Sequence, residues 1–164
     1  MTKTPNSKIK QHAGDILKSK TFNSQKNFMQ HGNYTTYDHI VSVAERSLRY
    51  AEKFHLKVDE KAMVRAALLH DYYLYDWHNC GGPLKCYWHC LRHPHEAADN
   101  AKKEFDMTKR ELRMIKRHMF PCTFLPPTSR EGLLISMADK ACAVHEMRER
   151  RKLKKAAKKA AKKA

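Results

Sequence analysis

Long apolar runs are missing from this chain of 164 residues. No stretch approaches the roughly 20 apolar residues that a membrane-spanning helix needs, and the polar N-terminus lacks the apolar core of a signal peptide. The five cysteines are an odd number, which argues against a complete disulfide framework and favours a reducing compartment. We therefore expect a cytoplasmic protein without a membrane span.

Acidic residues are also scarce. The sequence holds 17 Asp and Glu against 33 Lys and Arg, a formal net charge of +16. Half of this excess lies in residues 151–164, which contain eight basic residues and no acid. Such a balance favours anionic partners, namely nucleotides, nucleic acid or acidic lipid surfaces.

The alternation typical of strands does not stand out, whereas helical spacing is regular. Apolar residues recur every three or four positions over residues 40–51. Asp59 is a candidate helix N-cap, Pro94 suits the first turn of a further helix, and capping-box patterns open at Thr108 and Thr128. These signals predict an all-α domain of five or more helices. A hydrophobic content of 41% is sufficient for one core.

Three stretches of the chain differ in composition. Residues 1–34 are polar, with one candidate helix at residues 9–18. Residues 35–147 carry the regular helical signals and form the predicted domain. Residues 148–164 are rich in Lys and Ala, which favour helix locally, but no apolar side chain larger than alanine follows Leu153. We expect a basic helical tail that cannot pack on a core.

The connection at residues 76–92 is rich in aromatic residues and cysteine, and it breaks at Gly81-Gly82-Pro83. A structural zinc site is one interpretation of this connection and free thiols are the other; the absence of Cys-x-x-Cys favours the thiols. The potential zinc ligands are Cys80, Cys86, His89 and Cys90. Aromatic residues around the connection belong either to the core or to a stacking surface for a nucleobase. They are Tyr72, Tyr73, Tyr75, Trp77, Tyr87 and Trp88.

A histidine and an aspartate stand side by side where an apolar helical run ends, at His70 and Asp71. Imidazole nitrogen and carboxylate oxygen are ligands for divalent ions such as Fe, Mn, Zn and Ni. The position suits a buried metal better than a solvated surface. Further residues of the same ligand types surround the pair in the sequence. They are His39, His93, His118 and Asp139.

The order His, His-Asp, His, His, Asp resembles that of the HD-domain superfamily of metal-dependent phosphohydrolases, over about residues 36–146. The segments that carry the resemblance are His39-Ile40-Val41-Ser42-Val43-Ala44, Leu68-Leu69-His70-Asp71, His93-Pro94-His95-Glu96-Ala97-Ala98, Met114-Ile115-Lys116-Arg117-His118 and Ala138-Asp139-Lys140. The layout is closest to small single-domain members, including bacterial diadenosine-tetraphosphate hydrolases. The additional elements of cyclic-di-GMP phosphodiesterases are absent from residues 72–75 and 119–121.

The resemblance implies an HD-domain helical bundle at residues 35–147 that holds a divalent transition metal, with two ions rather than one. Fe or Mn is expected, with Zn or Ni as alternatives. One ion would be held by His39, His70, Asp71 and Asp139, and the second by His93 and His118, with Asp71 bridging. A mononuclear site on the first four residues is the alternative.

The same resemblance implies hydrolysis of a phosphate ester or anhydride by attack of a metal-activated water. The substrate would be a nucleotide or a small phosphorylated metabolite. Asp71 would act in catalysis as the bridge, His95 would touch the substrate or a metal ligand, and Lys140 would meet a substrate phosphate. The alternatives are a solvated helix start for His95 and a plain surface charge for Lys140.

A non-catalytic protein is the rival hypothesis: an HD domain that binds metal or nucleotide, or that is tethered to nucleic acid through its tail. The complete ligand set favours the enzyme, whereas the absence of a recognisable general acid or base after the His-Asp pair keeps the rival open. For the tail itself, a solvated extension and a non-specific nucleic-acid contact are the two interpretations. No sequence pattern of a nucleic-acid-binding fold accompanies it.

Overall fold

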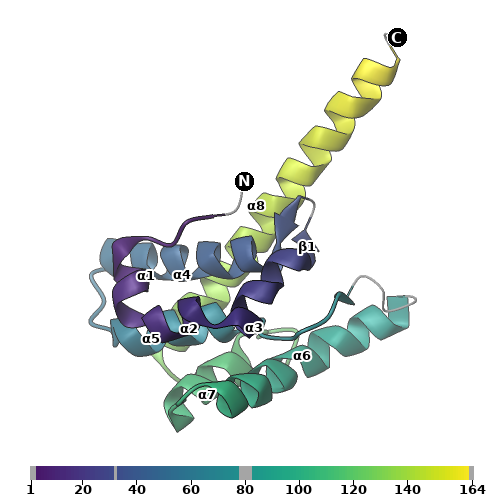
Figure 1. Cartoon of the computed structure of the whole chain (residues 1–164). Helices are drawn as coiled ribbons and strands as arrows, with labels where there is room; N and C mark the ends of the chain where they lie inside the picture. Colours follow the sequence, from purple (N-terminus) through teal and green to yellow (C-terminus); the bar gives the residue numbers. More distant parts are fainter. Residues whose placement is uncertain (1–2, 32, 78–82, 163–164) are drawn as a thin grey trace.

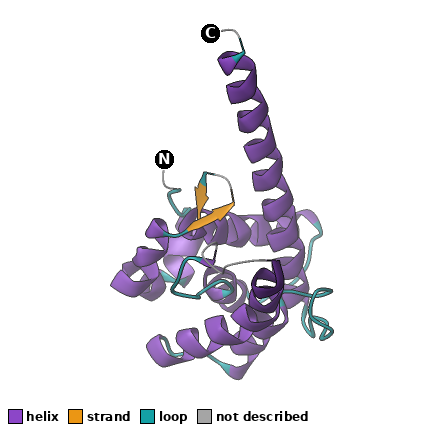
Figure 2. Cartoon of the chain, turned by 90° about the vertical axis from the view of Figure 1, so that its right-hand side faces the viewer, coloured by secondary structure: helices purple, strands orange, loops and turns teal. Residues whose placement is uncertain are grey.

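Five helices make up the bundle of the computed structural model, which describes residues 3–31, 33–77 and 83–162, apart from the side chains of residues 31 and 83–87. They are α4 (Thr36–Lys53), α5 (Glu60–Leu69), α6 (Pro83–Glu104), α7 (Lys109–Arg117) and α8 (Arg130–Ala161). Short elements precede them: α1 (Ser7–His12), α2 (Gly14–Lys18), α3 (Lys20–Asn23), the 3₁₀ helix η1 (Ser24–Asn27) and the strands β1 (Met29–His31) and β2 (Tyr34–Thr35). The predicted all-α fold is confirmed, with one small antiparallel hairpin added to it (Figure 2).

The bundle is arranged around α4, α5 and α8. Helix α4 packs against both α5 and α8, while α6 packs against α7, and α5 contacts α7 and so joins the two parts. In Figure 1 the pair α6 and α7 lies below α4 and α5. Apolar side chains of four helices meet in one core and are fully buried, among them Ile40, Leu68, Leu69, Ile115 and Ile135.

Side-chain caps fix where several helices begin. Thr35 and Asp38 form a capping box at the start of α4, and Thr108 and Glu111 form the predicted one at the start of α7. Asp59, the predicted N-cap of α5, accepts a hydrogen bond from the backbone of the third residue onward at 3.0 Å. These caps orient α4, α5 and α7, whose residues reach the centre of the bundle.

The capping box predicted at Thr128 is wrong. Ser129 caps α8 instead, with its hydroxyl accepting a backbone N–H of the first turn. The Glu131 carboxylate, which a capping box would turn back to the N-cap, accepts from the backbone N–H of Asp59 at 2.9 Å and pairs with Arg110 at 2.9 Å. The Glu131 carboxylate thus binds Asp59 and the charged Arg110, which are distant in the sequence, and does not bind the backbone at the start of its own helix.

The polar N-terminal segment packs on the bundle. The single helix predicted at residues 9–18 is split at Ala13 (φ −140°, ψ 36°) into α1 and α2. Ile9, Ile16 and Phe22 are fully buried and belong to the same core as the bundle. The change of direction at Ala13 allows two very short helices to follow the curved surface of the bundle.

Helix α6 begins earlier than predicted. It starts at Pro83, so Pro94 lies inside it and not in its first turn. An internal proline costs a helix about 3 kcal/mol, and burial of Ala97, Ala98 and Ala101 contributes stabilisation against that cost. Helix therefore replaces much of the predicted connection at residues 76–92. Its Cys80, Gly81 and Gly82, and the side chains of Cys86 and Tyr87, lie outside the described residues, so the preference for free thiols over a zinc site stays a prediction.

Helix α8 is continuous from the bundle into the tail. Its last buried residue is Glu146, and the side chains of residues 150–162 are all exposed. In Figures 1 and 2 this part projects from the bundle as a straight arm. The predicted helical tail is confirmed. Over the described ranges, no helix has the length and apolar character required to cross a membrane.

Candidate metal centre

Six predicted ligands come together in the middle of the bundle. His39 lies near the start of α4, and His70 and Asp71 follow directly after α5. His93 belongs to α6, His118 directly follows α7, and Asp139 belongs to α8. Their exposed fractions are all 8% or less. The bundle therefore gathers, from five helices, every residue that the sequence pattern indicated as a metal ligand.

Main-chain carbonyls orient three of the four imidazoles. His70 and His118 each follow the last residue of a helix, and each donates from Nδ1 to the carbonyl three residues earlier, at 2.8 Å and 2.7 Å. His93 donates from Nδ1 to the carbonyl of His89 at 3.0 Å. Because a carbonyl only accepts, Nδ1 carries the proton in each ring. Each Nε2 then presents a lone pair to the centre, as a metal ligand must.

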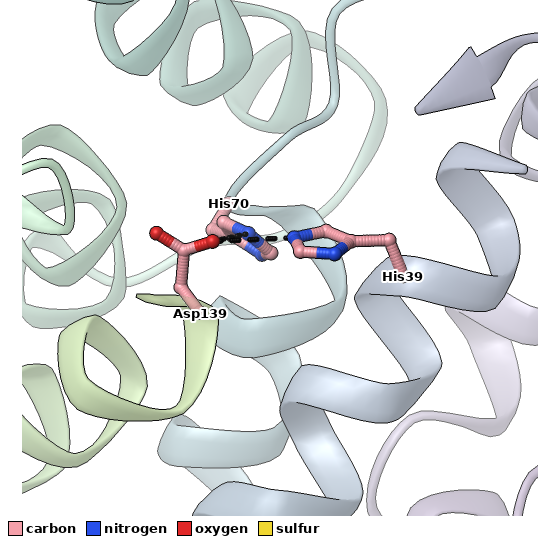
Figure 3. A group of neighbouring side chains, drawn as sticks. All are labelled: His39, His70 and Asp139. Carbon is pink, nitrogen blue, oxygen red and sulfur yellow. Dashed lines mark hydrogen bonds and ion pairs between the residues drawn. The ribbon is translucent and has the colours of Figure 1, made fainter. Parts of the chain in front are cut away.

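One set of side chains, named the first group, consists of His39, His70 and Asp139. The Oδ1 atom of Asp139 lies 3.2 Å from His39 Nε2 and 3.8 Å from His70 Nε2 (Figure 3). The three ligand atoms lie within 4.8 Å of one another, and all three residues are buried. This spacing is compatible with one cation between two nitrogens and a carboxylate oxygen.

His93 and His118 form the second group. Their Nε2 atoms face each other at 3.1 Å. With both protons on Nδ1, this contact would bring two lone pairs together, and lone pairs do not bond to each other. A cation that both nitrogens share removes the conflict. The short distance therefore supports a cation at this position.

Asp71 connects the two groups. Its Oδ1 lies 3.2 Å from His93 Nε2 and 3.6 Å from His118 Nε2, whereas its Oδ2 lies 3.6 Å from His70 Nε2 and 3.9 Å from His39 Nε2. In the described part of the chain, Asp71 Oδ1 and His70 Nε2 are buried without a hydrogen-bond partner. Unsatisfied buried polar atoms are costly, so their presence together with this donor set fits a bound divalent metal.

A family model for the HD domain matches residues 36–144, about two thirds of the chain. The chain belongs to the HD-domain family. The resemblance predicted from the motifs is thus confirmed, and members of this family are in general metal-dependent phosphohydrolases. No curated protein and no solved structure gives a significant match.

The charge states of Asp71, Asp139 and His118 in the HD site suit metal ligands, whereas the neighbouring carboxylates raise the pKa of His39 and His70. Burial would raise the pKa of Asp71 and Asp139, but the neighbouring histidines hold the pKa of each carboxyl well below its usual range. Burial, together with charge on His70 and His93, lowers the pKa of His118 to about 3. Ionised carboxylates and a neutral imidazole are the forms that coordinate metals.

Glu146 is a site residue that the sequence interpretation missed. Both of its carboxylate oxygens lie 3.0 Å from His39 Nδ1, and its exposed fraction is 1%. Burial alone would lower the pKa of His39, but hydrogen bonds to Asp139 and Glu146 raise it well above its usual value. Glu146 follows Asp139 by seven residues, two helical turns, so both lie on one face of α8. This spacing is the feature of the sequence that could have indicated Glu146 as a site residue.

Gln30 is a second missed residue, and it comes from the hairpin. Its amide donates to Asp71 Oδ2 at 2.8 Å, and its carbonyl oxygen accepts from Trp77 Nε1 at 3.2 Å and from the Tyr73 hydroxyl. Gln25 supports the same place by donating to the Asp71 main-chain carbonyl at 2.9 Å. The N-terminal segment thus holds the shared carboxylate in position.

A cavity of about 210 Å³ opens over the centre and is lined by both Asp71 and Asp139. Tyr73 and Trp77 form part of its wall, and Trp77 stacks on His89 with 2° between the ring planes. Part of the predicted aromatic cluster thus borders the site. Other members do not: Tyr72 belongs to the core, and Trp88 is 55% exposed.

Of the two other candidate catalytic residues, only Lys140 reaches the site. Its ammonium group lies 3.6 Å from Asp139 Oδ2, donates to the His118 carbonyl at 2.9 Å and lines the cavity. The His95 side chain is exposed on α6, and the fold does not bring it to the metal ligands. His95 follows His93 by two residues, which turns it by roughly 200° around the helix. Among the described residues no contact joins His95 to a metal ligand, and its contact with the substrate stays a prediction.

Proposed function

We propose that this HD-domain chain is a phosphohydrolase that cleaves a phosphate ester or anhydride of a nucleotide or small phosphorylated metabolite, by attack of a metal-activated water. The observation that carries the proposal is the position of Asp71. One of its oxygens faces the first group and the other faces the second group. A carboxylate placed in this way suits a bridge between two cations.

Two ions fit the donor set. The first would be held by His39, His70, Asp71 and Asp139, and the second by His93 and His118 together with Asp71. Mixed imidazole and carboxylate ligation favours Fe or Mn, with Zn or Ni as alternatives. Divalent metals supply two functions in such sites: they lower the pKa of a ligated water and they neutralise phosphoryl charge.

The chain itself supplies orientation and a positive charge. Lys140 is held by the His118 carbonyl and by the Ser136 hydroxyl, at 2.9 Å and 3.1 Å, so its ammonium group is fixed at the cavity wall. We infer that it binds a phosphoryl oxygen of the substrate. Tyr73 and Trp77 offer flat apolar surface beside it, on which a base or another planar group can pack.

The rival is a non-catalytic HD protein that binds metal or nucleotide at the same site. One observation favours it. Among the described residues that line the cavity, Lys140 is the one Lys or Arg side chain, whereas phosphoryl transfer sites commonly use several positive groups. The two candidates share the metal ligands and differ in turnover.

Two measurements, made one after the other, distinguish the phosphohydrolase from the non-catalytic HD protein. Protein purified without chelator is first analysed for metal, and we expect about two equivalents of a transition metal. Turnover is then measured on phosphomonoesters, phosphodiesters and nucleoside polyphosphates, with Lys140→Gln as a variant that should raise KM more than it lowers kcat. Protein that binds none of Mn, Fe, Ni or Zn contradicts the site. Bound metal without turnover on any of these substrate classes supports the rival.

A further inference from the structure

Four of the eight basic residues at 151–164 lie on one side of the exposed arm of α8. Arg151, Lys155, Lys158 and Lys162 are separated by four, three and four residues. At 3.6 residues per turn, these spacings place the four side chains within roughly 60° of arc. We name these four residues the cationic stripe. Alanines and Leu153 occupy the opposite side of the arm, at Ala156, Ala157 and Ala160.

Among the residues that the structure describes, no acidic side chain forms an ion pair with the cationic stripe. Glu149 is the last acidic residue of the sequence, and it pairs with Lys152, beside the stripe, at 2.8 Å. All four stripe residues are exposed, and the arm projects away from the bundle (Figure 2). From Arg151 to Lys162 the stripe extends over about 16 Å, at 1.5 Å per residue. A row of charges on one side of a straight rod matches a partner that carries regularly spaced negative charge.

An anionic lipid surface and nucleic acid both carry closely spaced negative charge. The side of the arm opposite the cationic stripe discriminates between them. A helix that binds a lipid surface needs large apolar side chains such as Trp, Phe or Leu opposite its cationic face. Here that side offers Leu153 and alanines alone. Nucleic acid needs no apolar contact, because its affinity for lysine comes from release of counterions condensed on the phosphates. The composition of the arm therefore favours nucleic acid.

The arm also favours a duplex over a single strand. Proteins that bind single strands stack the bases on aromatic side chains, and no aromatic residue follows His145 in the sequence. A duplex presents one phosphate charge per 1.7 Å of axis, and about 16 Å of straight helix can follow such a row. We propose that the cationic stripe binds the phosphate backbone of duplex nucleic acid without regard to sequence. This inference is independent of the proposed phosphohydrolase activity.

Two variants of the full chain test the stripe. The first replaces Lys155, Lys158 and Lys162 with Gln. The second exchanges two of them with alanines of the opposite side, as Lys155→Ala, Lys158→Ala, Ala157→Lys and Ala160→Lys, and so keeps composition and net charge while distributing the basic residues around the whole helix. Helix content should not change, because the exchange leaves the numbers of Ala and Lys unaltered. Circular dichroism checks this.

Binding is measured by fluorescence anisotropy with a mixed-sequence DNA duplex of about 20 base pairs, over a series of salt concentrations. Each phosphate contact contributes about −0.9 to the slope of log K against log salt, so the Gln variant should lose about 3 of that slope and bind more than tenfold more weakly at low salt. The exchanged variant should resemble the Gln variant. If it binds as tightly as the unmodified chain, net charge alone acts and the stripe is overturned.

Two further probes decide the kind of partner. A single strand of the same length should bind more weakly than the duplex at equal salt, because the arm offers no stacking surface. Vesicles that contain about one third phosphatidylserine should bind more weakly still, because the arm lacks an apolar anchor. Equal or tighter binding of the single strand overturns the assignment to a duplex. Tighter binding of the vesicles would make a membrane surface the partner in place of nucleic acid.

Discussion

The two groups of histidines in the site are supported in different ways. In the first group, His39 rests on the carboxylate of Glu146, and Asp139 adds a second carboxylate. In the second group, His93 and His118 rest on neutral main-chain carbonyls, and among the described residues Asp71 is the acidic side chain within ion-pair distance of them. The first group is therefore rich in negative charge, whereas the second is nearly neutral.

This difference predicts unequal affinity for metal. A cation at the first group interacts directly with two carboxylates and, through His39, with a third. A carboxylate behind an imidazole also raises the basicity of its other nitrogen. A cation at the second group gains less Coulomb energy. We expect the first group to bind its ion at a lower metal concentration than the second group. Occupancy of the second group would then determine whether both ions are bound.

Removal of the shared carboxylate should have the largest effect. Asp71→Ala is expected to abolish turnover, by at least ~10³-fold, and to lower metal content at both groups, because each loses an oxygen. Asp71→Asn keeps the shape but loses the charge, and should behave similarly. Elemental analysis and a turnover assay measure both effects, and circular dichroism verifies the fold. Near-normal turnover of either variant would contradict the proposed mechanism.

Single histidine variants should separate the two groups. His118→Ala is expected to retain about one equivalent of tightly bound metal, because the first group stays intact. His39→Ala should weaken the tighter site, so that little metal remains after dialysis. Metal titration by calorimetry, with each variant compared to the unmodified chain, measures the difference. Equal losses in the two variants would show that the groups do not differ in affinity.

Glu146→Gln should have an intermediate effect. The amide still accepts a hydrogen bond from His39, but the negative charge is gone, and loss of such a supporting group typically lowers metal affinity 10–100-fold. The second group should change by less than about twofold, because Glu146 contacts only His39 among the proposed ligands. Glu149→Gln is the matched control, since Glu149 lies on the same helix and pairs with Lys152. A Glu146→Gln variant with unchanged affinity at both groups would remove the proposed support.

Removal of residues 148–164 should have the smallest effect on the site. The last buried side chain of α8 is Glu146, so the truncated chain keeps the core and all six ligands. Metal content and turnover should stay unchanged, and unfolding free energy should change by less than about 0.5 kcal/mol, as expected for exposed positions. Thermal unfolding and metal analysis test this. Loss of the fold would mean that the arm supports the bundle.

The metal ligands could be predicted because each belongs to a short motif, and the order of these motifs resembles that of the HD-domain family. His70-Asp71 ends an apolar helical run, and His118 follows an amphipathic helix with a capping box. Local helix signals thus lead to His70 and His118, which directly follow a helix, whereas other ligands such as His93 and Asp139 lie within helices. The start of α6 could not be predicted in this way, since a proline inside a helix and one at its start give the same local signal.

The supporting residues were harder to predict because their partners are distant. Gln30 lies on a strand of three residues, too short to show alternation, and its contact with Asp71 spans 41 residues. Glu146 has the correct spacing from Asp139, but the sequence does not show which turn of α8 lies opposite His39. Both contacts depend on the packing of α4, α5 and α8, which is a tertiary property.

The continuity of α8 restricts where the chain can change in length. Inserting one residue between Asp139 and Glu146 would turn the second carboxylate by about 100° and move it 1.5 Å along the axis, away from His39. The same insertion after Met147 would only rotate the arm relative to the bundle. Tolerance to insertions and deletions should therefore change abruptly at Met147, with strict length before it and free length after it.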